Sequence, residues 1–255
     1  MPEVSRQAVV EKGAQLADDV KVGPFVYIGS CVRIGPGCVI DSGATVTGQT
    51  VIGAKCRIFP LAVVGSAPDG SDQMGTCTIG QANTIREHVT INAGCDEPTQ
   101  IGDDNLIMIG CLVGAGARIA SHCVLNNCTQ INPGARIDDY VWTSAFTSVL
   151  PGGSVGAYTF LVGYTGVETD APPFAMVQGY PFRVRGVNSE RLRRCGFGDD
   201  DIRALKEAFR QLYNGSADQI NEPALRKMQD RKDLNPHVVR LIEHIQAGLA
   251  KRQSK

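Results

Sequence analysis

Aliphatic residues recur at every sixth position along most of this chain. One run continues from Val10 to Val64, a second covers Ile79 to Ile91, and a third extends from Ile101 to Val167 with Thr143 as its one polar member. A period of six matches neither an α-helix, with about 3.6 residues per turn, nor a flat strand, with a period of about 2. It indicates an internal repeat of the kind that builds solenoids.

The positions next to this column have preferences of their own. A small residue stands two positions earlier, as at Ala8, Ala44 and Cys56, and glycine often follows the aliphatic residue. This pattern fits a short strand and a turn, so three hexads close a triangular coil of eighteen residues whose strands stack about 4.8 Å apart. We predict an all-β solenoid of about eight coils. Five cysteines fall on the small inward column and are predicted to be packing thiols: Cys38, Cys56, Cys77, Cys111 and Cys123.

Two segments interrupt the repeat, and the repeat ends well before the C-terminus. Residues 66–78 and 93–100 are rich in Gly, Pro, Asp and Ser, which predicts loops that leave the prism, either as functional loops or as plain insertions. After Val167 the pattern stops, and Ala171-Pro172-Pro173 marks the predicted exit. Helices are predicted from Asp199 to Asn214-Gly215 and from Asn235-Pro236 onward. We expect a β-helix domain of residues 1–185 and a helical domain of residues 186–255 that covers the open end of the solenoid.

Composition narrows the function classes. The formal net charge of −1 gives no electrostatic footprint for nucleic acid or an anionic membrane. No run approaches the ~18 apolar residues of a membrane span, and the N-terminal residues lack an apolar signal region, so a cytoplasmic location is expected. The nine cysteines include no C-x-x-C pair, and the histidines lack metal-ligand spacing. We expect no metal site and no cofactor.

Several segments resemble one family of hexapeptide-repeat enzymes. They are Ile85-Arg86-Glu87-His88-Val89-Thr90-Ile91, the segment Gly102 to Ile109, Pro172-Pro173-Phe174 through Gln178-Gly179, and, most specific, Gly186 through Phe197 (GVNSERLRRCGF). The chain resembles the acyl-carrier-protein-dependent UDP-N-acetylglucosamine O-acyltransferases of lipid A biosynthesis over essentially its whole length. The resemblance implies a left-handed parallel β-helix, a homotrimer, and two partners, acyl carrier protein and a UDP-amino sugar.

The catalytic positions of that family are replaced in this chain. The resemblance implies a histidine as general base, and its position is occupied by Ala115. The family's oxyanion donor, a glycine N–H, falls on Pro133, which has no N–H. The spacing alone supports the same conclusion, because Ala115, Pro133 and Pro151 stand eighteen residues apart and should stack on one corner, where none can transfer a proton.

Other residues remain as candidates for catalysis and binding. His88 and His122 both follow an inward aliphatic residue by three positions, which predicts turn positions, and each is a weak substitute for the missing base. His237 and His244 are expected at the surface of the tail. The resemblance implies substrate-binding roles for Asn92, Asn127, Asn188, Glu190, Arg193 and Arg194. The arginine-rich segment fits an acidic carrier protein and nucleotide phosphates, and ordinary solvated charge is the alternative.

Two functions remain open at this point. The first is an acyltransferase for a UDP-amino sugar that works with altered catalytic residues. The second is a non-catalytic protein that binds an acyl carrier or a nucleotide sugar. Either way, standard acyl transfer is expected to be absent or very slow, because both a base and an oxyanion donor are missing.

Overall fold

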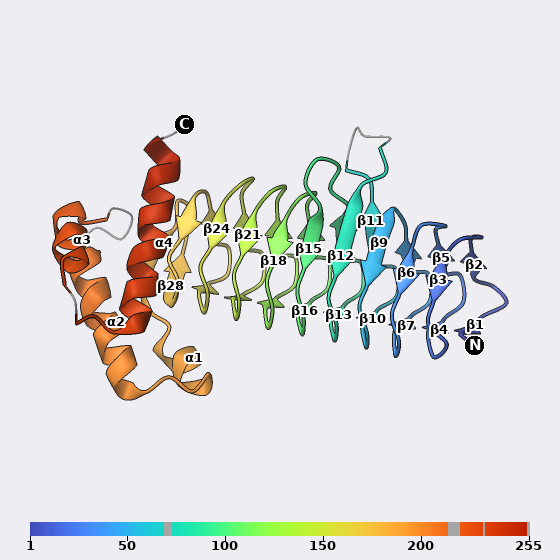
Figure 1. Ribbon diagram of the computed structural model, residues 1–255, viewed down its shortest axis with the longest axis horizontal. Helices are drawn as coiled ribbons and strands as arrows, with labels where there is room; N and C mark the ends of the chain where they lie inside the picture. The colour runs from blue at the N-terminus through green and yellow to red at the C-terminus, as the bar shows by residue number, and fades with distance from the viewer. Residues whose placement is uncertain (69–72, 214–219, 232, 254–255) are drawn as a thin grey trace.

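The computed structural model describes residues 1–68, 73–213, 220–231 and 233–253. Three sheets form the faces of a long triangular prism, with one strand of each coil in each sheet (Figure 1). Sheet A consists of β1 (Glu3–Val4), β4 (Lys21–Val22), β7 (Val39–Ile40), β10 (Arg57–Ile58), β13 (Thr84–Ile85), β16 (Leu106–Ile107), β19 (Val124–Leu125), β22 (Trp142–Thr143), β25 (Phe160–Leu161), β28 (Ala175–Gln178) and β29 (Arg183–Val187).

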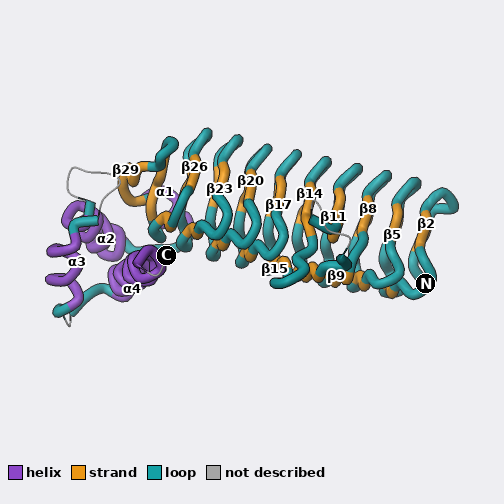
Figure 2. The backbone as a smooth tube through the Cα atoms, turned by 90° about the horizontal axis from the view of Figure 1, so that it is seen from above, coloured by secondary structure: helices purple, strands orange, loops and turns teal. Residues whose placement is uncertain are grey.

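The other two faces have nine strands each. Sheet B consists of β2 (Val9–Val10), β5 (Tyr27–Ile28), β8 (Thr45–Val46), β11 (Val63–Ser66), β14 (Thr90–Asn92), β17 (Leu112–Val113), β20 (Gln130–Ile131), β23 (Ser148–Val149) and β26 (Gly166–Val167). These strands follow one another along the prism in Figure 2. Sheet C consists of β3 (Gln15–Leu16), β6 (Arg33–Ile34), β9 (Gln49–Ile52), β12 (Thr76–Ile79), β15 (Thr99–Ile101), β18 (Arg118–Ile119), β21 (Arg136–Ile137), β24 (Ser154–Val155) and β27 (Asp170–Ala171).

The core is the aliphatic column that the period predicts. Ile40, Ile58 and Ile85 lie in register on successive coils and are fully buried. Thr143 keeps its place in the column because its hydroxyl lies 2.7 Å from that of Thr129, so a buried polar group has a partner. The five predicted packing cysteines are buried as well, and desolvation raises the pKa of two of them, Cys77 and Cys123, to about 12.

The prism is longer than the predicted eight coils. It begins at β1, where Val4 pairs with Val22, and it continues past Val167 through β27 and β28. The predicted exit at residue 171 was therefore wrong. In the last coil Val155 pairs with Ala171, a separation of sixteen residues (171 − 155) instead of eighteen, so the six-residue period is lost although the coil is complete. β29 then pairs antiparallel with β28, and the predicted domain boundary at residues 185 and 186 falls within it.

In the described part of the tail, four helices follow the prism: α1 (Ser189–Arg194), α2 (Asp199–Leu212), α3 (Glu222–Gln229) and α4 (Pro236–Gln253). The predictions of α2 and α4 are confirmed, whereas α1 and α3 are too short for the periodicity to reveal. Gly198 is the N-cap residue of α2, and the Asp201 carboxylate accepts a hydrogen bond from the Gly198 N–H. The predicted helix end at residues 214 and 215 lies outside the described residues.

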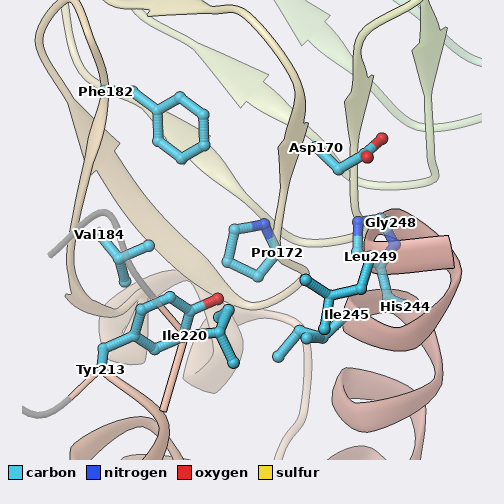
Figure 3. Close-up of a pocket in the computed structure, with 10 residues that line it drawn as sticks. All are labelled: Asp170, Pro172, Phe182, Val184, Tyr213, Ile220, His244, Ile245, Gly248 and Leu249. Carbon is cyan, nitrogen blue, oxygen red and sulfur yellow. The ribbon is translucent and has the colours of Figure 1, made fainter. Parts of the chain in front are cut away.

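The helices cover the C-terminal end of the prism (Figure 1). Figure 3 shows a cavity in this junction, where Phe182 and Val184 from the β28–β29 hairpin region face Ile245 and Leu249 of α4. His244 also lines the cavity and is half-buried, where a surface position was expected. His237 is half-buried as well, and its ring centroid lies 4.5 Å from that of Phe197.

Candidate functional site

The turns between the three faces stack into three corners, and the candidate residues are distributed over all of them. The B–C corner joins sheet B to sheet C and contains the turns at residues 115–116, 133–134 and 151–152. The C–A corner contains Asp104, His122, Tyr140, Tyr158 and Phe174. The A–B corner contains His88, Gly110, Cys128, Phe146 and Tyr164.

The B–C corner holds the column that the spacing of eighteen predicts. The Gly134 N–H donates to the Ala115 carbonyl oxygen at 3.0 Å, and the Gly152 N–H donates to the Pro133 carbonyl oxygen at 3.1 Å. Each turn needs a glycine with positive φ: Gly116 (70°), Gly134 (69°) and Gly152 (71°). Alanine and proline side chains therefore stack at this corner, where no side chain of the turn itself can accept a proton.

A groove of ≈ 460 Å³ runs along the B–C corner, and a loop contributes one of its walls. Its lining consists of Pro68, Gly94, Cys95, Asp96, Glu97, Ala115, Gly116, Arg118, Pro133, Gly134 and Arg136. The loop is residues 93–98, between β14 and β15, as predicted from the interruption of the repeat. The Gly116 N–H donates to Thr99 Oγ1 at 2.9 Å, and Arg118 Nη2 lies 2.7 Å from Glu97 Oε2. The loop thus brings a carboxylate to the corner, which the sequence pattern did not reveal.

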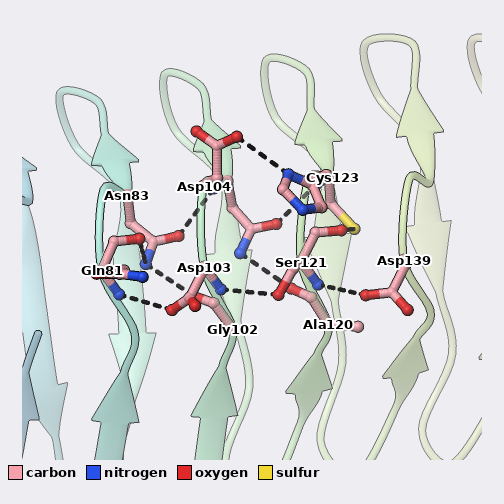
Figure 4. A network of polar contacts seen from close by, with 11 residues as sticks. Gln81, Asn83, Gly102, Asp103, Asp104, Ala120, Ser121, Cys123 and Asp139 are labelled. Carbon is pink, nitrogen blue, oxygen red and sulfur yellow. Dashed lines mark hydrogen bonds and ion pairs between the residues drawn. The ribbon is translucent and has the colours of Figure 1, made fainter. Parts of the chain in front are cut away.

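His122 belongs to a stack on the C–A corner. Its Nδ1 lies 3.0 Å from Asp104 Oδ2, and its ring centroid lies 4.7 Å from that of Tyr140. The stack continues to Tyr158 at 4.8 Å, where burial raises the pKa of the phenol. A ladder of hydrogen bonds runs along the same corner, from the Ser121 N–H to Asp139 Oδ1 and on through the neighbouring coils (Figure 4). His122 is thus engaged on a different corner from Ala115.

His88 lies on the A–B corner, with a φ of 57°. The neighbouring Glu87 carboxylate pairs with Arg86 at 2.9 Å, and this hydrogen-bonded arginine lowers the pKa of Glu87. Within one chain, therefore, neither histidine shares a corner with Ala115.

A second pocket, of ≈ 180 Å³, lies where α1 covers sheet A. It is lined by Trp142, Phe160, Asn188, Glu190, Arg191 and Arg194. The structure thus brings together three of the predicted binding residues: Asn188, Glu190 and Arg194. Arg194 Nη2 contacts Glu190 Oε1 at 2.5 Å.

The remaining three predicted binding residues lie elsewhere. Arg193 is not part of the lining and pairs with Asp199 at 3.3 Å. The Asn92 amide donates to Ser66 Oγ at 3.1 Å, between the bases of the two loops. Asn127 lies on the A–B corner, where its carbonyl oxygen accepts from the Phe146 N–H. These residues do not converge with the α1 pocket within one chain.

Arg191 belongs to the arginine-rich segment and lines the pocket, although the sequence assigned it no binding role of its own. Its guanidinium carbon lies 4.7 Å from the ring centroid of Trp142, the one tryptophan of the chain. Its Nε is buried, and the described residues give it no hydrogen-bond partner. Arg193 and Arg194 each have a carboxylate partner, whereas Arg191 is held by an aromatic face. No sequence pattern distinguishes Arg191 from the other arginines of this segment.

Among the described residues, no group of three or more His, Cys, Asp or Glu side chains could hold a metal ion. In the same part of the chain, no helix has the length and apolar character to cross a membrane.

Known proteins share the sequence and the fold of this chain. The family model described as "Udp N-acetylglucosamine O-acyltransferase; Domain 2" matches residues 170–253, and the bacterial transferase hexapeptide model matches residues 13–48. The acyl-[acyl-carrier-protein]–UDP-N-acetylglucosamine O-acyltransferase of Saccharophagus degradans is 48% identical over 216 residues, which cover 81% of this chain and 82% of that protein. This chain belongs to that acyltransferase family.

Other members and their structures agree. The enzyme of the same name from Thermodesulfovibrio yellowstonii is 37% identical over 254 residues, or 97% of this chain and 98% of that protein. The crystal structure of a UDP-N-acetylglucosamine acyltransferase from Bacteroides fragilis superposes with a TM-score of 0.90 at 30% identity, covering 95% and 96% of the two chains. The Campylobacter jejuni acyltransferase gives 0.88 at 27% identity, with 94% and 95% covered. The left-handed parallel β-helix with a helical tail is thereby confirmed.

Proposed function

We propose that this protein transfers an acyl chain from acyl carrier protein to a hydroxyl of a UDP-amino sugar, more slowly than a family member with a histidine base. The observation that carries the proposal is the α1 pocket, in which Asn188, Glu190 and Arg194 converge beside Trp142 in a chain of this family. The relatives are named for these two substrates, which favours an acyltransferase over a purely non-catalytic binding protein.

The chemistry of the α1 pocket suits a nucleotide. Trp142 and Phe160 supply aromatic walls. Asn188 and Glu190, which also contact the Tyr158 carbonyl oxygen and Arg194, respectively, supply an amide and a carboxylate that suit a base with both donors and acceptors. Arg191 has no carboxylate partner among the described residues, so its positive charge is available to a phosphate. The groove at the B–C corner is then the site where the sugar and the thioester meet.

We propose a homotrimer as the working assembly. The outward positions of sheet B bear no charge: Val9, Tyr27, Thr45, Val63, Thr90, Leu112, Gln130, Ser148 and Gly166. Sheet C, in contrast, presents Arg33, Arg118 and Arg136. A neighbouring subunit packed on sheet B would form a further side of the groove at the B–C corner, because this corner is one edge of sheet B. A cytoplasmic location is part of the proposal, since carrier proteins and nucleotide sugars are cytoplasmic molecules.

The test is a turnover assay run beside a binding measurement. Acyl carrier protein bearing a 3-hydroxyacyl chain and UDP-N-acetylglucosamine are the substrates, and product is followed by mass spectrometry. Trp142, as the one tryptophan, reports UDP binding through its fluorescence. We expect saturable binding and slow turnover. Binding without any turnover would instead support a non-catalytic role, and absence of both would contradict the proposal.

A further inference from the structure

The B–C corner lacks a proton acceptor of its own, yet one carboxylate lies directly against it. Gly116 occupies the turn next to Ala115, and a Cβ placed on it would lie 3.5 Å from the Glu97 Cβ and 3.4 Å from the Glu97 carbonyl oxygen. Glu97 therefore fills the space beside the corner that a side chain at position 116 would otherwise enter. From this geometry we infer that Glu97 is the general base of the proposed acyl transfer, on which this inference rests.

The loop that carries Glu97 is fixed at both ends. At its start, the Thr76 N–H donates to the Gly94 carbonyl oxygen at 2.9 Å, and the Gly94 N–H donates back at 3.1 Å. At its end, Thr99 Oγ1 accepts from the Gly116 N–H at 2.9 Å. A Cβ at Gly94 would collide with the Glu97 carbonyl oxygen, so this glycine is what allows the loop to pack so closely. These contacts fix the backbone of the loop and thereby hold Glu97 beside the corner.

Arg118 positions the Glu97 carboxylate and engages only one of its two oxygens. Its Nη2 contacts Oε2 of Glu97 at 2.7 Å, and no described residue forms a hydrogen bond to Oε1. The Glu97 side chain is 68% exposed and that of Arg118 is 43% exposed, so the pair opens onto the groove and is not sealed in the protein. One oxygen is oriented by the arginine, and the other can accept a proton from a substrate hydroxyl.

Other groups fit the role less well. His88 and His122 lie on the A–B and C–A corners. Cys95 Sγ lies 3.8 Å from the Gln73 carbonyl oxygen, which belongs to the other loop. Asp96 lines the same groove, but none of the described residues forms an ion pair with it of the kind that Arg118 forms with Glu97.

The proposed step balances without a further reactant. A carboxylate oxygen of Glu97 takes the proton of the sugar hydroxyl while the oxygen of that hydroxyl attacks the thioester carbonyl carbon. The new C–O bond forms and the C–S bond breaks. The departing thiolate of the carrier protein then takes the proton back from the Glu97 carboxylic acid, which restores the starting carboxylate.

The direct test is Glu97→Gln, which keeps the shape of the side chain and removes its basicity. We expect kcat to fall about 10²-fold or more, in the range of a lost general base, while the Kd for UDP measured by Trp142 fluorescence stays unchanged. Glu207→Gln is the matched control, because Glu207 also pairs with an arginine, Arg210, but lies on α2. It should leave kcat within about twofold of the parent. Asp96→Asn, compared in the same assay, separates the two carboxylates of the loop.

A second variant gives a readout that a structural role would not move. In the double variant Glu97→Gln with Ala115→His, part of the lost activity should return, now with a pH–rate limb near the ~6.5 of an imidazole that is absent from the parent profile. Parent-like turnover of Glu97→Gln, or a loss confined to Asp96→Asn, would overturn the assignment to Glu97. A parent that binds UDP but never turns over would instead overturn the proposed acyl transfer itself.

Discussion

The B–C corner and the α1 pocket differ in how far their residues match those that the family resemblance implies. The α1 pocket gathers Asn188, Glu190 and Arg194, three residues that the family resemblance implies, whereas the corner presents Ala115 and Pro133, for whose positions the resemblance implies a base and an oxyanion donor. The two regions lie on different parts of the prism, so binding and chemistry can change independently. We propose that the binding surface is preserved while the chemistry at the turns is replaced.

The fold tolerates such replacement because neither Ala115 nor Pro133 is part of the buried core. At the B–C corner the new residues even suit the turn. Proline favours the second position of a type II turn and glycine the third, which matches Pro133-Gly134, where Gly134 has a φ of 69°. The C–A corner shows the opposite solution. Its non-glycine residues, such as Tyr140 at a φ of 60°, adopt a costly conformation that ring stacking offsets.

Restoring the family residues at the corner should produce the largest effect. Glu97 is the inferred base of the parent, so most of the expected gain comes from the missing oxyanion donor, which is worth ~10²–10³-fold, although groups that act as a unit are not additive. We therefore expect Ala115→His combined with Pro133→Gly to raise kcat at least about 10²-fold over the parent. Each single change should recover less, because Pro133 still lacks an N–H when only position 115 is changed.

The measurement is product formation under saturating acyl carrier protein and UDP-N-acetylglucosamine for the parent, both single variants and the double variant. Parent turnover as fast as that of an ordinary family member would show that the corner residues are not needed.

The next largest effect should fall on the α1 pocket. Arg191→Gln removes the one pocket arginine without a carboxylate partner among the described residues, so the Kd for UDP should rise about tenfold or more, as for a charged hydrogen bond lost to a phosphate. Uridine, without phosphates, should bind parent and variant alike. Arg193→Gln is the matched control, because Arg193 pairs with Asp199 outside the pocket. Equal losses of UDP affinity in both variants would contradict the assignment.

The sequence predicts those features of the two regions that follow from regular spacing. It misses those that depend on contacts between residues outside the repeat. The period of six predicts the core column and the stacking of Ala115 on Pro133, because both follow from fixed spacing. It misses the last coil, since a coil of sixteen residues shifts the column. It also misses Glu97, because loop 93–98 follows no repeat and its packing depends on a contact between Gly94 and the corner.

The proposed trimer can be tested with a charged residue placed on the face that is expected to meet a neighbouring subunit. Leu112 lies on the uncharged outward face of sheet B, the face proposed to meet a neighbour. Leu112→Glu should shift the sedimentation profile from trimer towards monomer at micromolar concentration, because a buried unpaired charge costs several kcal/mol. Val51→Glu on sheet C, whose face already bears arginines, should leave the trimer intact. A parent that sediments as a stable monomer would contradict the proposed assembly.

The smallest expected effect concerns the stability of the turn at the B–C corner. If Pro133 was favoured because it restricts the unfolded chain, then Pro133→Ala should lower the free energy of unfolding by about 0.4–1 kcal/mol, without any lost contact in the core. Gly134→Ala should cost at least as much for a different reason, since a Cβ is strained at a φ of 69° although the nearest atom is 4.0 Å away. Urea unfolding, monitored by circular dichroism with Leu61→Ala as an exposed control, measures both. If Pro133→Ala leaves stability unchanged while Gly134→Ala lowers it, the proline does not strengthen the turn, and its effect at this corner is confined to the missing N–H.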